Sequence, residues 1–318
     1  MFSIALFLLG FVLLIQGANW FVDGAASIAH RLRIPPLVIG LTIVSLGTSA
    51  PEALISATAS WQNHTALALG NVFGSIITNT LLGLGLAATL APLKVKNSTV
   101  WKEIPFLLFA ITMVLVMTSD SFFDPTTTSV ISKRDGLILL SFFVLFLIYT
   151  VRLARSKQEN AFADTIPVHS QIKSIVLFFV GLVSLMLGSH WAVTGAVATA
   201  QHFGISESII GLTIIAIGTS LPEITTAVIA GYKGHADMAV GNVVGANLFN
   251  ALWILGMGAV IRPLIVLPIA LQSAIFAAFV TLLLMIFLWT KKNRMLSRGE
   301  GITFLALYAL FTVFLIYY

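Results

Sequence analysis

Two short stretches with nearly the same sequence decide the fold of this chain. Gly47-Thr48-Ser49-Ala50-Pro51-Glu52 in the first half returns as Gly218-Thr219-Ser220-Leu221-Pro222-Glu223 in the second half. The halves align at a shift of 171 residues without a gap from Gly17 to Val95, and residues 39–79 contain 18 identities in 41 positions. Low-complexity apolar sequence would not align Pro, Glu and Asn in one register, so the chain contains an internal repeat.

The composition places the chain in a membrane. Of its 318 residues, 58% are hydrophobic and only 9% are charged, whereas soluble domains carry about 25% charged residues. The net charge of +5 comes from basic residues in short loops between apolar runs, a pattern that reports membrane orientation rather than nucleic-acid binding. The absence of cysteine excludes disulfide and thiolate chemistry.

Ten apolar stretches are long enough to cross a membrane as helices, which takes about 20 residues each. They run over residues 4–27, 36–61, 66–90, 104–119, 136–154, 172–199, 208–231, 238–260, 267–289 and 301–317. We therefore predict an all-α membrane protein with ten transmembrane helices in two inverted-topology repeats of five. The first repeat covers residues 1–155, a short cytoplasmic connection covers 156–171, and the second repeat covers 172–318. Because each half has an odd number of spans, the second half enters the membrane from the opposite side, a plan common in secondary transporters.

The basic residues predict the orientation of these spans. With ten spans, 14 of the 17 Lys and Arg residues fall in loops on one side and 3 on the other. The positive-inside rule then places the richer side in the cytoplasm and both termini outside. Residues 1–11 contain no Lys or Arg, so the first segment is predicted to be a retained helix rather than a signal peptide.

Two acids, Glu52 and Glu223, lie in the middle of apolar spans that contain no Lys or Arg. A carboxylate at membrane depth costs at least about 2.5 kcal/mol and usually marks a pathway or a binding site. Further polar residues recur at helical spacing, so each span has one polar face that must turn inward in lipid. These stripes comprise Ser45, Thr48, Ser49, Glu52, Asn71, Ser75 and Asn79 in the first half and Thr219, Ser220, Glu223, Asn242 and Asn250 in the second.

A proline stands directly before each acid. Pro51 and Pro222 lack an N–H and push on the carbonyls of Gly47 and Gly218 four residues earlier, so both helices are predicted to kink and to free carbonyl oxygens. The resulting cluster offers carboxylate, amide, hydroxyl and carbonyl oxygens. Such hard ligands suit Ca²⁺, whereas soft transition metals prefer Cys or His. Two ionised glutamates balance the charge of one Ca²⁺ or two Na⁺.

Three functions fit this cluster. The leading one is secondary antiport of Ca²⁺ against Na⁺; the alternatives are Ca²⁺/H⁺ antiport by the same two glutamates and, less favoured, a cation channel. An enzyme is not expected, because Ser49 and Ser220 have no His or Lys in the same spans to activate them. We expect inorganic cations and the lipid bilayer as partners, no nucleic acid, no implied protein partner and no permanently bound cofactor.

The repeated segments carry a family resemblance. Gly-Thr-Ser-x-Pro-Glu and Gly-Asn-Val-x-Gly, each present twice, resemble the two alpha-repeats of the cation/Ca²⁺ antiporter superfamily, and the whole chain resembles prokaryotic sodium/calcium exchangers. The resemblance implies a prokaryotic plasma (inner) membrane and a first and sixth helix that slide past the core during alternating access. It implies Ca²⁺ ligation by the side chains of Glu52 and Glu223 and the carbonyls of Thr48 and Thr219. It implies Na⁺ ligation by the carbonyls of Ser45 and Ala216 and the side chains of Ser49, Ser75, Asn79, Ser220 and Asn250.

The chain departs from the family pattern at three positions. Ala246 stands where many members carry a serine ligand, Asn250 where some carry aspartate, and Ile76 where asparagine is usual, as in Asn247 of the second half. Alanine offers no side-chain oxygen, so the resemblance implies that one Na⁺ site nearer the outside lacks a ligand, which bears on the stoichiometry of exchange.

Overall fold

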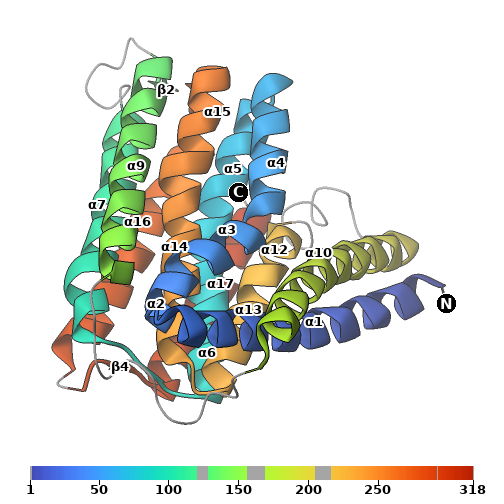
Figure 1. The fold of residues 1–318 in the computed structure, drawn as a ribbon. Helices are drawn as coiled ribbons and strands as arrows, with labels where there is room; N and C mark the ends of the chain where they lie inside the picture. The colour runs from blue at the N-terminus through green and yellow to red at the C-terminus, as the bar shows by residue number, and fades with distance from the viewer. Residues whose placement is uncertain (1, 120–127, 156–168, 205–215, 292, 318) are drawn as a thin grey trace.

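The structure is a computed structural model that describes residues 2–119, 128–155, 169–204, 216–291 and 293–317. Helices make up nearly all of this part of the chain (Figure 1). The helices of the first half are α1 (Phe2–Leu32), α2 (Pro36–Ile39), η1 (Gly40–Val44), α3 (Ser45–Thr48), α4 (Ala50–Trp61), α5 (Thr65–Thr78), η2 (Asn79–Leu84), α6 (Gly85–Leu90), η3 (Thr99–Glu103), α7 (Ile104–Met117) and α9 (Lys133–Arg155). Those of the second half are α10 (Gln171–His202), α12 (Ala216–Thr219), α13 (Leu221–Tyr232), α14 (Ala236–Leu248), η5 (Phe249–Ile254), α15 (Leu255–Ile261), α16 (Pro268–Thr290) and α17 (Arg298–Tyr317). The η segments are π-helical turns, and four short strands complete the fold: β1 (Leu93–Lys94), β2 (Val130–Ile131), β3 (Leu264–Ile265) and β4 (Met295–Leu296).

Eight helices in the described residues are long and apolar enough to cross a membrane, or nine if the bent pair Pro36–Thr48 and Ala50–Trp61 is one span. They correspond to nine of the ten predicted spans. For the remaining span, predicted over 208–231, residues 208–215 lie outside the described residues, and its second part is seen as α12 and α13. The fourth span runs over Thr99–Met117, so it begins five residues before the predicted start at 104.

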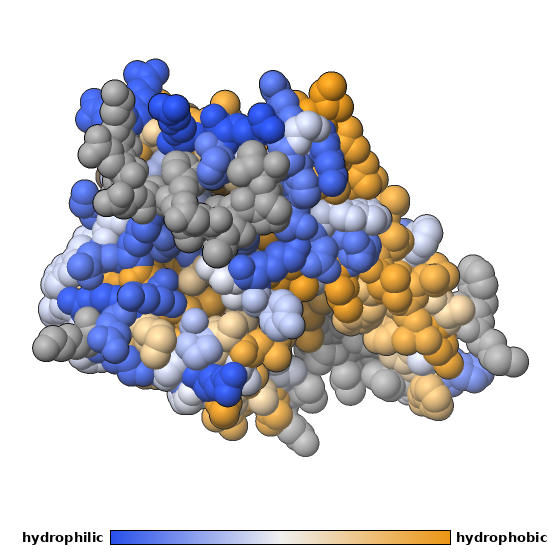
Figure 2. Space-filling view, turned by 60° about the horizontal axis from the view of Figure 1, so that its bottom comes forward, coloured by the Kyte–Doolittle hydropathy of each residue, from blue (hydrophilic) through white to orange (hydrophobic). Residues whose placement is uncertain are grey.

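The outer surface of the molecule suits a lipid environment. Large apolar side chains are exposed on the peripheral helices, for example Val12 at 62%, Phe179 at 59% and Leu310 at 66% of their surface. Figure 2 shows hydrophilic residues gathered over the end of the molecule that carries β4, with hydrophobic surface extending toward the N-terminus. An apolar exterior of this extent would be unfavourable in water and is favourable in hydrocarbon.

The helix boundaries recur between the two halves. In α4 and α13 a proline occupies the first turn, where its missing N–H costs nothing, and both helices have 12 residues. Each is followed by a helix that passes into a π-helical turn, α5 into η2 and α14 into η5. The duplicated sequence therefore gives duplicated local structure.

Two pairs of short strands join the halves. The strand β1 pairs antiparallel with β4, so that Leu93 lies opposite Leu296, and β2 pairs antiparallel with β3, so that Ile131 lies opposite Leu264. Each pair takes one strand from the first half and one from the second. The halves are consequently fastened to each other rather than standing as separate bodies.

Two of the long helices lie at the centre of the fold. In Thr65–Leu90 and Ala236–Ile261, 78% of the hydrophobic window is buried inside the protein, against at most 39% in the other long spans. The broken helices α3–α4 and α12–α13 pack against this pair. These four segments, which we call the central helices, are the ones that carry the polar stripes.

The helices α1 and α10 form a separate arm that lies beside the central helices and is inclined to the upright ones (Figure 1). Glycine recurs every seven residues along their contact: Gly10, Gly17 and Gly24 on α1 and Gly181, Gly188 and Gly195 on α10. A Cβ atom at Gly181 would lie 2.4 Å from the backbone nitrogen of Phe21, and one at Gly10 would lie 2.4 Å from that of Ala192. The two backbones therefore touch along an antiparallel seam, as small residues allow in membrane helices.

An ion pair links this arm to the central helices. The Lys233 ammonium, just after α13, lies 2.7 Å from Asp23 Oδ1 on α1 and donates to the Asn19 carbonyl at 3.1 Å. The pair therefore fastens α1 to the end of α13.

The glycine seam predicts the effect of adding one methyl group. Gly181→Ala forces two backbones apart, so we expect a loss of stability of about 1–3 kcal/mol. Gly299→Ala is the matched control, because nothing lies within 4 Å of the added Cβ and alanine favours a helix by up to about 1 kcal/mol. Thermal unfolding in detergent measures both variants, and equal midpoints would contradict backbone contact at the seam.

Candidate cation site

The site is built on two helix breaks. The helix α3 ends at Thr48 and α4 begins at Ala50 with a bend of 51° between them. The intervening Ser49 has φ −83° and ψ 6°, and Ser220 in the second half has φ −89° and ψ 3°. The predicted break is therefore present in both halves and falls between the threonine and the proline. Pro51 and Pro222 have no N–H to offer the carbonyls of Gly47 and Gly218 four residues earlier.

The two predicted carboxylates both lie inside the cluster that the central helices form. Both Glu52 and Glu223 have 0% exposure, and neither takes part in an ion pair among the described residues. The serine of each repeated motif lies beside the acid of the other half: Ser49 donates to Glu223 Oε1 at 2.9 Å, and Ser220 lies close enough to Glu52 to interact with its carboxyl group. The two broken helices therefore contact each other through their repeated motifs.

Two asparagines hold the acid-bearing segments in place. Asn71 donates to the carbonyl of Glu52 at 3.2 Å, and Asn242 donates to the carbonyl of Glu223 at 3.2 Å. The Asn242 amide oxygen also faces the Thr48 hydroxyl at 3.4 Å, which joins the two halves. Because these side chains fasten the backbone next to each acid, we interpret them as positioning residues.

The central helices contain an unusual number of buried polar atoms without a partner. Buried polar groups are nearly always hydrogen-bonded, so each exception needs an explanation. In the described residues, all but three of the unpartnered side-chain atoms belong to the central helices. They are Glu52 Oε1 and Oε2, Glu223 Oε2, Ser75 Oγ, Asn79 Oδ1, Ser220 Oγ, Thr226 Oγ1, and Asn250 Oδ1 and Nδ2.

The chemistry of these atoms fits a hard cation. Eight of the nine atoms are oxygens, and three of the oxygens belong to the two carboxylates. Ca²⁺ takes 6–8 oxygen ligands, and a cation would supply both the charge and the coordination that the carboxylates lack.

The two carbonyls predicted to bind Na⁺, those of Ser45 and Ala216, differ in their surroundings. The Ser45 carbonyl already accepts the Ser49 N–H at 2.9 Å and the Thr48 hydroxyl at 3.3 Å. A cation at this carbonyl would have to displace the longer of these two bonds. Ala216 is the first residue of α12, and it directly follows residues that lie outside the described part of the chain.

The second layer of polar residues joins the two halves through amides. Asn79 donates to Asn247 Oδ1 at 3.3 Å, and Asn247 in turn donates to the Thr80 hydroxyl at 2.9 Å. Ser75 is buried without a partner, whereas its counterpart Ala246 is buried and has no hydroxyl. The repeat therefore presents an oxygen on one side of the site and a methyl group on the other.

Sequence reasoning missed one residue of this cluster. Thr226 is buried and its hydroxyl has no partner in the described residues. It stands three residues after Glu223 and so continues the same helical face. The search for repeated residues passed over it, because the matching position of the first half is Ile55.

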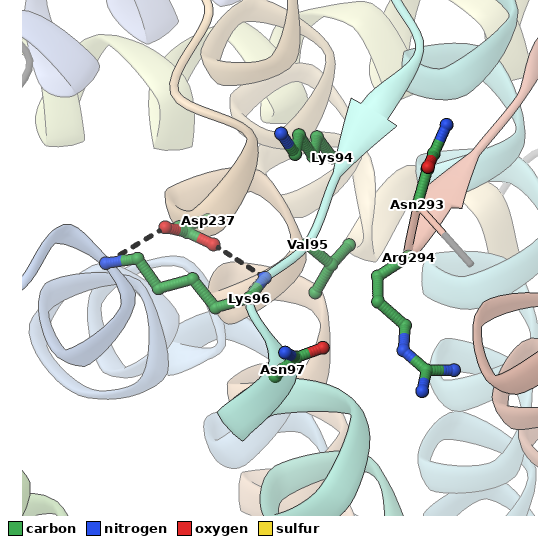
Figure 3. Close-up of a pocket in the computed structure, with 7 residues that line it drawn as sticks. All are labelled: Lys94, Val95, Lys96, Asn97, Asp237, Asn293 and Arg294. Atoms are coloured by element: carbon green, nitrogen blue, oxygen red, sulfur yellow. Dashed lines mark hydrogen bonds and ion pairs between the residues drawn. The ribbon is translucent and has the colours of Figure 1, made fainter. Parts of the chain in front are cut away.

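A surface cavity of about 520 Å³ lies elsewhere, at the end of the molecule where β1 meets β4. Figure 3 shows Lys94, Lys96, Asp237 and Arg294 in its wall, with Lys96 paired to Asp237. The Arg294 guanidinium is also engaged, at the Leu288 carbonyl and over the Trp101 ring. Three cations and one carboxylate make a poor cation site, so we interpret this cavity as part of the hydrophilic end of the molecule that carries β4.

The sequence also matches a family of known proteins. Residues 2–152 and 173–317 match the family described as sodium/calcium exchanger protein. The chain is 40% identical to the putative antiporter CaxA of Alkalimonas amylolytica, over 92% of each chain. It is 35% identical to the inner membrane protein YrbG of Escherichia coli, over 94% of this chain and 92% of that one.

A solved structure extends the comparison to the fold. The sodium-calcium exchanger NCX_Mj, soaked with zero Na⁺ and Ca²⁺, superposes with a TM-score of 0.82 at 32% identity, covering 97% of each chain. The chain belongs to the sodium/calcium exchanger family. It is therefore an integral membrane protein of a cation/Ca²⁺ antiporter family, which is a family of transporters rather than enzymes.

The unpartnered oxygens predict that Ca²⁺ stabilises the folded chain. A ligand at 100 times its dissociation constant adds about 2.7 kcal/mol, so Ca²⁺ should raise the unfolding temperature in detergent. Glu52→Gln and Glu223→Gln should each remove this increase, because an amide cannot supply the second negative charge. Gln272→Leu is the control, since Gln272 Oε1 is unpartnered outside the central helices. An equal increase in the glutamine variants would place the Ca²⁺ site elsewhere.

Proposed function

We propose that this protein exchanges Ca²⁺ for Na⁺ across the membrane by alternating access. The observation that carries the proposal is the pair of buried, uncompensated carboxylates of Glu52 and Glu223, set among unpartnered oxygens of repeated helices. In lipid, two such charges are stable when a cation or protons neutralise them. A site that must always be neutralised, at the meeting point of two related halves, is suited to bind one ion and then release it for another.

The proposed architecture has ten transmembrane helices in two inverted repeats, with both termini outside. The recurring helix boundaries support the repeat, and five spans per half give it the inverted sense. The 14-to-3 distribution of basic residues supports the orientation. The location proposed is a prokaryotic plasma membrane, in keeping with the name of the relative in Escherichia coli. No protein partner is invoked.

We assign Ca²⁺ to the side chains of Glu52 and Glu223 and to the carbonyls of Thr48 and Thr219. The two acids match its charge, and both carbonyls stand at helix breaks. We assign Na⁺ to the surrounding oxygens. These are the carbonyls of Ser45 and Ala216 and the side chains of Ser49, Ser75, Asn79, Ser220 and Asn250.

The second candidate function is Ca²⁺/H⁺ antiport. Protons on Glu52 and Glu223 would neutralise the site as well as Na⁺ does, and would need no other ligand. The buried, unpartnered oxygens of Ser75, Asn79 and Asn250 favour Na⁺, because these neutral groups lie outside the carboxylate pair and have no role in proton exchange. This observation puts Na⁺ coupling first.

Ca²⁺ flux into proteoliposomes tests the proposal. With pH clamped equally on both sides, an outward Na⁺ gradient should drive Ca²⁺ uptake, and replacing Na⁺ with choline should stop it. More than two Na⁺ per Ca²⁺ would move net charge, so an imposed membrane potential should then change the flux. Uptake driven by a pH gradient without Na⁺ would support the proton-coupled alternative instead.

Ala246 predicts a specific weakness in Na⁺ binding. Its methyl group replaces the hydroxyl that Ser75 supplies on the related side, so fewer oxygens are available to Na⁺ there. Ala246→Ser should lower the Na⁺ concentration for half-maximal Ca²⁺ efflux and leave the Ca²⁺ affinity nearly unchanged. Ala239→Ser, at a buried position earlier on α14, is the control. Superimposable Na⁺ curves for wild type and Ala246→Ser would remove position 246 from the Na⁺ site.

A further inference from the structure

We call the repeated Gly-Thr-Ser-x-Pro-Glu segment of each half its signature. The α1–α10 arm touches each broken helix at the first glycine of this signature, which is Gly47 in the first half and Gly218 in the second. At Gly47, an added Cβ would lie 3.2 Å from Leu182 Cδ1 of α10 and 3.7 Å from the Phe21 ring of α1. At Gly218, it would lie 2.2 Å from Val193 Cγ2 of α10. The arm therefore rests one residue before the threonine of each signature.

These two contacts are not equivalent under the repeat. The 171-residue shift relates Val193 to Val22, so a symmetric arm would place Val22 against Gly47. Leu182 and Phe21 face Gly47 instead. Gly218 is buried, whereas Gly47 is partly exposed. Because the two halves are related, the arm could pack closely against either signature. In this structure it packs more closely against the second signature than against the first.

One hydrogen bond accompanies this position. The Ser189 hydroxyl on α10 donates to the Gly218 carbonyl at 2.7 Å, and both groups are buried. That carbonyl lacks its helical donor because Pro222, four residues later, has no N–H. Ser189 therefore supplies, from the arm, the donor that the proline removes from the broken helix.

The other half has no counterpart to this bond. The residue that matches Ser189 is Ala18, which is buried on α1 and carries no hydroxyl. The Gly47 carbonyl stands before Pro51 in the same way as the Gly218 carbonyl stands before Pro222. In the related arm position, the first signature would therefore receive no side-chain donor from residue 18.

We propose that Ser189 is a positioning residue that fastens the arm to the second signature and biases the protein toward the described arm position. Moving the arm away from Gly218 leaves a carbonyl unpartnered there and gains no equivalent bond at Gly47. The two arm positions consequently differ in free energy although the repeat makes them alike in shape. This inference rests on the inverted repeat and alternating access of the proposed function.

The chain is well suited to a direct test of arm position, because it contains no cysteine. Spin labels on Leu54→Cys of α4 and Leu187→Cys of α10 report the distance between a central helix and the arm. Both side chains are exposed, Leu54 at 69% and Leu187 at 46%, so the labels leave the packing intact. Double electron–electron resonance in nanodiscs, without Ca²⁺, then gives the populations of the two arm positions.

Removing the bond should shift these populations. A hydrogen bond of ordinary strength corresponds to a change of roughly 2- to 12-fold in their ratio, so Ser189→Ala should raise the alternate position by that factor. Ala18→Ser should shift the ratio in the same direction by offering a donor to Gly47. The double variant should favour the alternate position most. Thr199→Val is the control, because its hydroxyl donates within α10, to the Gly195 carbonyl at 2.7 Å, and makes no other hydrogen bond among the described residues.

Two results would overturn the proposal. One is an unchanged distance distribution in both Ser189→Ala and Ala18→Ser, including a single distance in every variant. The other is a shift of equal size in Thr199→Val, which would make the effect a general loosening of α10. The experiment measures a distance rather than a flux, so it tests the role of Ser189 separately from Na⁺/Ca²⁺ exchange. A failure of Na⁺-driven Ca²⁺ uptake would not alter a measured population shift. An absent population shift would likewise not alter a measured Na⁺-driven uptake.

Discussion

Two buried carboxylates, Glu52 and Glu223, that have no ion-pair partner among the described residues are the constraint on which the rest of this structure depends. Burying one uncompensated charge is already costly, and burying two near each other adds repulsion. In the part of the chain that the structure describes, no Lys or Arg pairs with either acid. The surrounding structure supplies neutral oxygens instead, from serines, threonines and asparagines and from carbonyls freed at helix breaks. A site of this kind is completed by a mobile cation, and this links the local electrostatics to transport.

In the proposed function, the repeat would let such a site be reached from two sides. Each half contributes a broken helix with one acid and a following helix with an asparagine that holds the acid-bearing backbone, as Asn71 and Asn242 do. The short strand pairs fasten the halves into one body. The α1–α10 arm, sealed along its own glycine seam, contacts this body at the two signature glycines and at the Asp23–Lys233 ion pair. In the proposed alternating-access cycle, a displacement of the arm relative to this body would close one side of the site and open the other.

Much of this could be predicted from the sequence, because membrane helices and duplicated motifs leave strong patterns. The pairs of Pro and Glu residues located both breaks to within two residues, and the polar stripes identified most of the unpartnered oxygens. Features without a periodic signal were missed. Thr226 has no counterpart in the first half, and the Asn79–Asn247 contact joins helices whose packing cannot be deduced from spacing. The fourth span starts early because the polar π-helical turn Thr99–Glu103 continues into α7, where hydropathy alone suggests a loop.

Anomalous X-ray diffraction from crystals soaked in Ca²⁺ tests the central claim most directly. We expect one strong peak between the side chains of Glu52 and Glu223, within 2.3–2.6 Å of their oxygens and of the carbonyls of Thr48 and Thr219. The same soak of Glu52→Gln crystals should show no peak there. A Ca²⁺ peak away from both glutamates, with none between them, would contradict the assignment of the unpartnered oxygens to the transported cation.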